Sequence, residues 1–108
     1  MVYEIATLPV RPEHAAAFNR AFADVAHLLI RAKGYRGHLL APGIEHPEKF
    51  HLIVRWETLD DHTVHFEPSE DHRVFMLGLQ DYLSGEPTVE HIEGGEFSTG
   101  PWDAAPGK

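Results

Sequence analysis

The sequence predicts one α+β domain with the ferredoxin-like element order β-α-β-β-α-β, in which a four-stranded antiparallel sheet carries its helices on one face. Three observations support this. β-Rich stretches lie at residues 2–8, 35–42, 49–57 and 87–97. A helical period of apolar residues runs through 12–32, and a second helical segment follows a capping signal at residue 69. The length of 108 residues suits a single domain.

The first predicted strand, VYEIATL at residues 2–8, has apolar side chains on both faces. One face carries Tyr3, Ile5 and Thr7, and the other carries Val2, Ala6 and Leu8. Such a strand is usually covered on both sides. Because the helices cover only one face of the sheet, we expect a homodimer in which two sheets pack together, a dimeric α/β barrel.

The segment 12–32 is predicted to be a long helix. Its apolar residues recur at steps of four, three and four and share one stripe, made of Phe18, Phe22, Val25 and Leu29. Gly34 is a plausible C′ residue after its last turn.

Residues 35–42 and 49–57 are predicted to form a β-hairpin, since the connector GIEHPE contains both Gly and Pro. If residues 42 and 47 pair at its turn, His38 and His51 face each other across the hairpin. A slip of one residue puts them on opposite faces of the sheet.

The stretch WETLDDHTVHFEPSEDH, residues 56–72, carries two helix starts. Thr58, with Asp61 three residues later, is a variant of the capping box and predicts a short helix over 59–66. Pro68 interrupts that helix, and Ser69 is a second N-cap that begins a helix over 70–84.

Composition excludes several classes of function. The formal net charge is −8, from 9 basic and 17 acidic residues, so neither nucleic acid nor a membrane surface is an expected partner. The chain has no cysteine, which excludes disulfides, a thiolate nucleophile and a zinc-thiolate site. Its N-terminus does not have the pattern of a secretion signal, and no apolar run approaches the roughly 18 residues of a membrane span. We therefore expect a cytoplasmic protein.

The end of the third strand resembles a known family. A strand that ends in Trp56, Glu57, Thr58 and Leu59, followed by a short helix with His65 nine residues after the tryptophan, resembles the antibiotic biosynthesis monooxygenase domain. The continuation HTVHFEPSEDHRVF is similar to one branch of that superfamily.

The resemblance covers residues 1–97 and leaves 98–108 as a C-terminal tail, whose Trp102 we expect to pack on a surface. It implies a dimeric α+β barrel with a pocket in each subunit between the sheet and the helices. It also implies oxidation of phenols, quinols or anthrones by O₂ without a metal or flavin. In that chemistry the protein deprotonates the substrate and holds it in a dry site.

Several residues are candidates for such a site. His65 is the expected acid-base group and His72 its assistant, since the unperturbed pKa of histidine lies near the working pH. Each also has a structural alternative, His65 as a loop-binding residue and His72 as part of a solvated face. Trp56, Phe66 and Phe75 are expected to form an aromatic wall, with Trp56 as a core residue in the alternative. Further polar candidates for substrate binding are Tyr3, His38, His51 and Arg55.

Three other functions stay open. The same pocket suits a dimeric binding module that holds a small apolar compound without chemistry. A metal site at His62, His65 and His72 is a less favoured hypothesis, because no HExxH pattern is present. Heme degradation is also less favoured, because the corresponding branch of the family has an asparagine on the first strand, whereas Asn19 is the only asparagine here and falls in the long helix.

Overall fold

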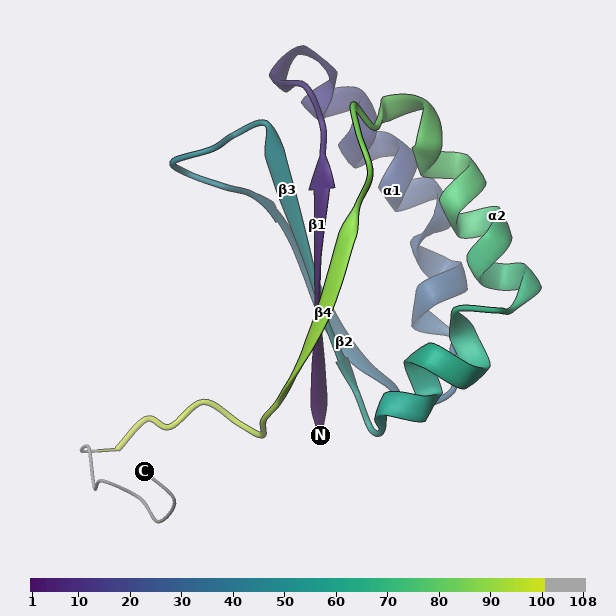
Figure 1. The fold of residues 1–108 in the computed structure, drawn as a ribbon, viewed down its shortest axis with the longest axis vertical. Coiled ribbons are helices and arrows are strands. Elements are labelled where there is room, and N and C mark those ends of the chain that lie inside the picture. The colour runs from purple at the N-terminus through teal and green to yellow at the C-terminus, as the bar shows by residue number, and fades with distance from the viewer. Residues whose placement is uncertain (101–108) are drawn as a thin grey trace.

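The computed structural model describes residues 1–100, and it has the predicted β-α-β-β-α-β order (Figure 1). Three short helices, η1 to η3, supplement that order. The elements are β1 (Val2–Pro9), η1 (Pro12–His14), α1 (Ala15–Ile30), β2 (Tyr35–Pro42), β3 (Lys49–Trp56), η2 (Asp61–Phe66), α2 (Glu70–Leu79), η3 (Gln80–Tyr82) and β4 (Thr88–Glu93). The predicted docking of Trp102 lies outside the described residues.

The four strands form one antiparallel sheet in the order β2-β3-β1-β4. Figure 1 shows this sheet nearly edge-on, with α1 and α2 on one face and no helix on the other. The predicted ferredoxin-like arrangement is therefore confirmed. We call the face without helices the open face. No helix within residues 1–100 is long and apolar enough to cross a membrane.

The hydrophobic core lies between the sheet and the helices. From the sheet it takes alternate residues of the strands, and from α1 it takes the stripe that the sequence predicts. Its fully buried members include Val10, Phe18, Leu29, Phe50, Val54, Trp56 and Leu79. Each large apolar side chain buried in this way contributes roughly 1.5–3 kcal/mol to folding.

Several element boundaries differ from the predicted ones. The helix predicted over 70–84 ends as an α-helix at Leu79, and a 3₁₀ turn, η3, follows it. The segment 12–32 begins as a 3₁₀ turn at Pro12 and becomes α-helical only at Ala15. The short helix at 61–66 is a π-helix, a rare form that occurs often at functional sites. β4 ends at Glu93, which pairs with Val2, the first residue of β1; beyond it only the backbone N–H of Gly94 continues the pairing, to the carbonyl of Met1 at 3.0 Å.

Both predicted helix caps are present. The Thr58 hydroxyl accepts a hydrogen bond from the backbone N–H of Asp61 at 3.1 Å. The Ser69 hydroxyl accepts one from the backbone N–H of His72, also at 3.1 Å, and this begins α2. These two caps orient the segment that carries the histidines relative to the sheet.

Gly34 is the turn residue after α1 and has a φ of 81°. Its carbonyl accepts the backbone N–H of Glu57 at 2.9 Å, and a β-carbon at this position would lie 2.1 Å from Asp61 Oδ2. Only glycine suits both the backbone angle and this close approach. The end of β3 and the start of η2 are thereby packed against the end of α1.

The hairpin has a register that separates its two histidines. Ala41 pairs with His51, and His38 pairs with Val54, so His38 and His51 lie on opposite faces. The pairing of residue 42 with 47 is wrong, because Pro42 pairs with Phe50 and the loop is longer.

Candidate functional site

A cavity of about 180 Å³ lies between the sheet and the segment formed by η2 and α2. Its walls are mainly apolar and come from both layers: Ala6, Leu8, Leu29, Leu52, Phe66, Phe75, Met76, Pro87 and Val89. Four side chains able to bind protons also line it, namely Glu4, Glu67, His62 and His72. An apolar cavity with a few converging polar groups is the usual form of a small-molecule site.

Glu4 is a carboxyl side chain directed into the core from β1. It shares a face of that strand with Ala6 and Leu8, and only 7% of it is exposed. Its Oε1 accepts the indole N–H of Trp56 at 2.9 Å. The pKa of Glu4 is raised to about 7, chiefly by burial and to a smaller extent by nearby Glu67, which together outweigh the lowering effect of the Trp56 hydrogen bond.

His62 lies next to Glu4, on η2, and is 2% exposed. Its Nε2 is 3.4 Å from Glu4 Oε1, and its Nδ1 forms a 2.8 Å hydrogen bond with Nε2 of His91 on β4. The pKa of His62 is lowered to about 4, chiefly by burial and to a smaller extent by the neighbouring His91 and His72. His62 is therefore a neutral imidazole at physiological pH, with one nitrogen toward Glu4 and the other toward His91.

Trp56 holds these two groups in place. Its indole N–H binds Glu4, and its ring stacks on His62 with centroids 5.4 Å apart and planes inclined by 16°. Phe66 packs on the same indole at 5.6 Å. Trp56 is fully buried and does not line the cavity, so the indole supports the polar groups from behind.

The far side of the cavity contains three of the residues predicted from the sequence. Phe66 and Phe75 line it, and their rings lie 6.2 Å apart in an edge-to-face arrangement. His72 also lines it and contacts Phe66 edge-to-face at 5.3 Å. Burial lowers the pKa of His72, although Glu67 acts in the opposite direction.

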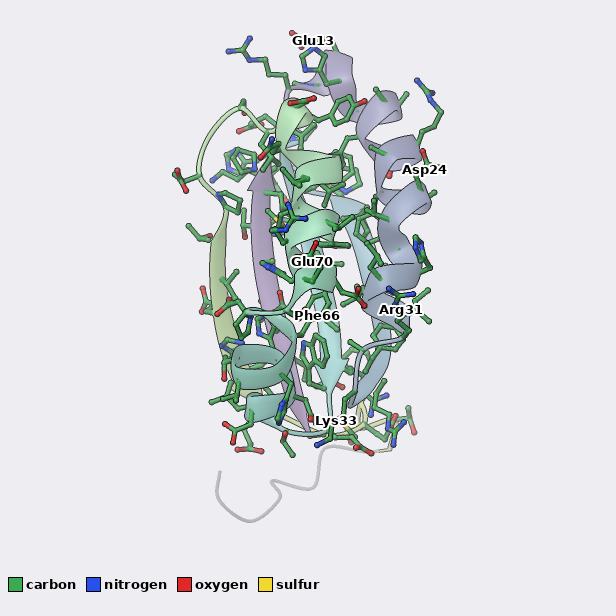
Figure 2. All side chains as sticks on the ribbon, turned by 90° about the vertical axis from the view of Figure 1, so that its right-hand side faces the viewer. Glu13, Asp24, Arg31, Lys33, Phe66 and Glu70 are labelled. Carbon is green, nitrogen blue, oxygen red and sulfur yellow. The ribbon has the colours of Figure 1, made fainter. Side chains whose placement is uncertain are left out.

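His65 does not line this cavity. It is an exposed residue of η2 and lies over a separate surface depression together with Arg31, Lys33 and Ser69. Figure 2, which looks onto the helical layer, labels Arg31 and Lys33 on this side of the molecule, with Phe66 beside η2. The catalytic role predicted for His65 stays a prediction, but the structure gives it no contact with Glu4 or His62.

Three other predicted residues lie on the open face of the sheet. Arg55 lies over the ring of Tyr3, 5.7 Å from its centroid, and binds Glu96 at 2.8 Å. His51 Nδ1 is 3.3 Å from the hydroxyl of Thr7. Side chains on this face are separated from the cavity by the sheet itself.

His38 faces the helices but lies away from the cavity. Its Nδ1 is 2.6 Å from the hydroxyl of Tyr35, and its ring packs on Phe22. Burial lowers its pKa. The structure therefore does not bring His38 together with the other candidates.

The sequence-based reasoning missed Glu4, Glu67 and His91, and it treated His62 only as a metal ligand. One signal was available for Glu4, because it shares a strand face with Val2, Ala6 and Leu8 and so occupies a core position. A carboxyl at a core position points to a function. No comparable local signal marks His91, since the site acquires it only when β4 pairs with β1.

The three histidines of the metal hypothesis do not converge. His62 and His72 line the cavity, whereas His65 is exposed over the other depression. Within residues 1–100, no group of three or more His, Cys, Asp or Glu side chains is arranged to hold a metal ion.

Comparison with known proteins shows the family. Residues 1–76 match the model of the antibiotic biosynthesis monooxygenase family. The uncharacterized protein YczJ of Bacillus subtilis (strain 168) is 36% identical over 93 residues, which cover 86% of this chain and 98% of YczJ. The chain therefore belongs to the antibiotic biosynthesis monooxygenase family.

Solved structures agree with this assignment. A "putative antibiotic biosynthesis monooxygenase" from Bordetella bronchiseptica is 33% identical, with a TM-score of 0.82 over 88% of this chain and 97% of the other. A cofactor-independent oxygenase from Streptomyces nogalater has a TM-score of 0.72 over 92% of this chain and 97% of the other. At 16% identity the latter supports the shared fold alone.

Proposed function

We propose that the protein is a cofactor-independent monooxygenase that oxidises a small phenolic or hydroquinone-like molecule with O₂. One observation carries this proposal: a buried carboxyl group with a pKa near 7 faces an apolar cavity beside a buried neutral imidazole. An acid-base group works best when its pKa lies near the working pH. Membership of the family and the fold shared with a cofactor-independent oxygenase support the same reaction class.

In the proposed reaction Glu4 first accepts and later returns a proton. The ionised carboxylate of Glu4 takes the hydroxyl proton of the substrate, and the electron pair stays on the resulting phenolate. The phenolate carbon gives electrons to O₂ and forms a hydroperoxide, for which the proton held by Glu4 is returned. Loss of water then leaves a quinone, so one oxygen atom enters the product and the other leaves as water. The apolar walls keep other water away from the peroxide.

The cavity limits the size and charge of the substrate. Its volume of about 180 Å³ is a little larger than the roughly 150 Å³ cavity that holds a single benzene ring in another protein. A one-ring phenol or hydroquinone therefore fits, and a three-ring anthrone does not fit without enlargement. Glu4 and Glu67 both disfavour an anionic substrate.

The predicted residues of the cavity take supporting roles in this proposal. Phe66 and Phe75 contact the two faces or edges of the substrate ring, as aromatic residues do at such sites. His72 lies on the α2 side of the cavity and serves as a second proton-binding group near the reacting oxygen.

The proposed active form is a homodimer that buries the open face of the sheet. Leu39, Ile53 and Ile5 pair in register across β2, β3 and β1 and form an apolar row on this face. Leu39 remains 58% exposed in the single chain. Packing of two such faces gives the dimeric barrel expected from the sequence.

The test is O₂ uptake by metal-stripped protein supplied with hydroquinones, naphthols and anthrones. Wild type is compared with Glu4→Gln, His62→Gln and His65→Ala, with Glu86→Gln as a control at an exposed carboxyl. We expect uptake with one- and two-ring compounds, and a loss of about 10²-fold or more in Glu4→Gln, as for removal of an acid-base group. Wild-type turnover that Glu4→Gln retains in full would contradict the role of Glu4.

The His65→Ala variant decides the sequence-based assignment. Loss of turnover in this variant alone would favour the exposed histidine over the buried pair. Binding of the same compounds, measured by calorimetry, without any O₂ uptake would instead favour the alternative of a dimeric binding module.

A further inference from the structure

Three side chains form a continuous path from the cavity to the surface of the protein. Glu4 lines the cavity, and Glu4 Oε1 lies 3.4 Å from Nε2 of buried His62. The opposite nitrogen of His62 binds His91 at 2.8 Å. His91 is only partly buried and lines a shallow surface depression beside Val2 and Leu59.

We propose that His91 is the outer end of a proton relay, Glu4–His62–His91, through which Glu4 exchanges its proton with bulk water while the cavity is occupied. The inference rests on the proposed function in one respect, that Glu4 has to be ionised before it accepts the substrate's proton. It concerns a residue that neither lines the cavity nor touches the substrate, so His91 is a positioning and relay residue.

The proton balance of the relay is simple. A proton leaves the Glu4 carboxyl and forms a new bond to Nε2 of His62, whose Nδ1–H bond breaks toward Nε2 of His91. The proton on Nδ1 of His91 then passes to water. Each ring gains one proton and loses one, so both imidazoles stay neutral and the only net change in charge is ionisation of the Glu4 carboxyl. The reverse sequence brings a proton from water to Glu4.

The site requires such a path because the protonation of Glu4 is divided near neutral pH. With a pKa of about 7, a large fraction of the carboxyl groups hold a proton when the substrate enters. A substrate that fills about 180 Å³ leaves little room for water beside Glu4. The relay allows that proton to leave by a route behind the substrate.

Trp56 keeps the middle of the relay aligned. Its stacking on His62 opposes rotation of the imidazole, so the two nitrogens stay directed at Glu4 and His91. The relay therefore works by exchange between the two tautomers of His62 and not by turning of the ring.

Glu67 is an alternative route by which the proton of Glu4 could reach water, since its side chain lies partly in solvent. Its Oε2 is 3.9 Å from Nε2 of His62, too far for a hydrogen bond, and it approaches the same nitrogen that faces Glu4. A proton that left through Glu67 would not pass through the imidazole ring. Glu67→Gln is therefore the matched control for His91→Gln.

The relay is tested first without turnover, by NMR of protein labelled with ¹⁵N-histidine. In the wild type, both nitrogens of His62 should give averaged signals, because its tautomers interconvert through His91. In His91→Gln, whose amide binds His62 but does not titrate, the averaging should stop, whereas Glu67→Gln should preserve it. A single fixed tautomer in the wild type, or averaging that survives in His91→Gln, would overturn the relay.

Measurement of turnover is a second, independent test of the relay. With a compound that the wild type oxidises, His91→Gln should lower kcat by roughly tenfold, less than the loss of a direct acid-base group, with little change in KM. Added imidazole should restore turnover in His91→Ala. Unchanged kcat in His91→Gln would contradict the relay. Absence of uptake by the wild type would count against the proposed oxygenase instead and leave the NMR signals to decide the relay.

Discussion

Glu4 and His62 are neighbours whose pKa values move in opposite directions for the same physical reason. Burial disfavours the charged form of each group, so it raises the pKa of the carboxyl to about 7 and lowers that of the imidazole to about 4. Near neutral pH the imidazole is therefore uncharged, whereas the carboxyl, 3.4 Å away, is divided between its protonated and ionised forms. This is how the protein keeps a base available inside an apolar core.

The first prediction follows from the raised pKa of Glu4. The folded state holds a proton on Glu4 between pH 4.5 and about 7, where the unfolded state has lost it, so Glu4 lowers stability as pH rises through this window. Relative to wild type, Glu4→Gln should gain about 3 kcal/mol in free energy of unfolding between the two ends of the window, at about 1.4 kcal/mol per pKa unit. Urea unfolding at several pH values measures this, and a difference that does not change with pH would contradict a buried, titrating Glu4.

His62 makes stability change with pH in the opposite direction, over a pH range that overlaps that of Glu4. Its lowered pKa means that the unfolded state binds the proton first, so His62 adds stability as pH rises from about 4 to 6.5. In the wild type the two slopes partly cancel. Stability of His62→Gln should accordingly fall more steeply with rising pH than that of the wild type, in the same urea series.

Trp56 sets the working pH of the proposed base. Its N–H lowers the pKa of Glu4, so Trp56→Phe, which removes this donor, should raise that pKa and shift the rise of kcat/KM toward higher pH. The carboxyl signal of Glu4 in ¹³C NMR reports the same shift without a substrate. A signal that titrates at the wild-type pH in Trp56→Phe would show that the hydrogen bond does not tune the group.

At the scale of elements, the site depends on how η2 is attached to the rest of the fold. Thr58 begins the segment, Gly34 allows it to approach the end of α1, and Ser69 begins the helix that follows. The sequence contains all three signals in local form. Their combined effect, a π-helix that directs His62 inward and leaves His65 exposed, depends on packing against β3 and α1.

Gly34→Ala tests this attachment. The substitution places a β-carbon against Asp61 and requires a φ of 81° from alanine, so we expect destabilisation of about 1–3 kcal/mol. Gly95→Ala is the control, since nothing lies within 4 Å of its β-carbon position, and it should stay within about 0.5 kcal/mol of wild type. Thermal unfolding of both variants compares them directly, and equal stability would mean that the turn after α1 tolerates a side chain.

At the scale of the whole molecule, the sheet separates the side chains that face the helices from those on the open face. Side chains toward the helices form the core and the cavity, whereas no helix within residues 1–100 covers those of the open face (Figure 1). On that face Arg55 contacts the segment after β4, through Glu96. The strands have apolar residues on both sides, and the row on the open face needs a cover that the helices do not provide. We propose that a second copy of the chain covers it, because two identical apolar faces can pack together.

The dimer prediction uses that row. Light scattering should give the mass of two chains for wild type and one chain for Ile53→Glu, because the charge would be buried at the centre of the interface. Leu77→Glu, at an exposed position of α2, should remain dimeric. Circular dichroism checks that both variants are folded, and a monomeric wild type would refute the interface.

Sequence alone determined the element order, the helix caps, the turn at Gly34 and the family resemblance. These features depend on local periodicity and on residues near one another in the chain, so they can be read without a structure. The hairpin register could not be determined in this way, because it depends on the length of the loop and on how the strands pair. The observed register places His38 and His51 on opposite faces of the sheet.

Tertiary structure decided which histidine meets the cavity and which partners it has. His62 and His65 are three residues apart on one short helix, and only packing shows that His62 is buried against Trp56 while His65 is exposed. Glu4, His62 and His91 come from the first strand, a middle helix and the last strand, so no local pattern joins them. Their pKa values follow from that assembly, because burial, which dominates the shifts of Glu4 and His62, exists only in the folded chain.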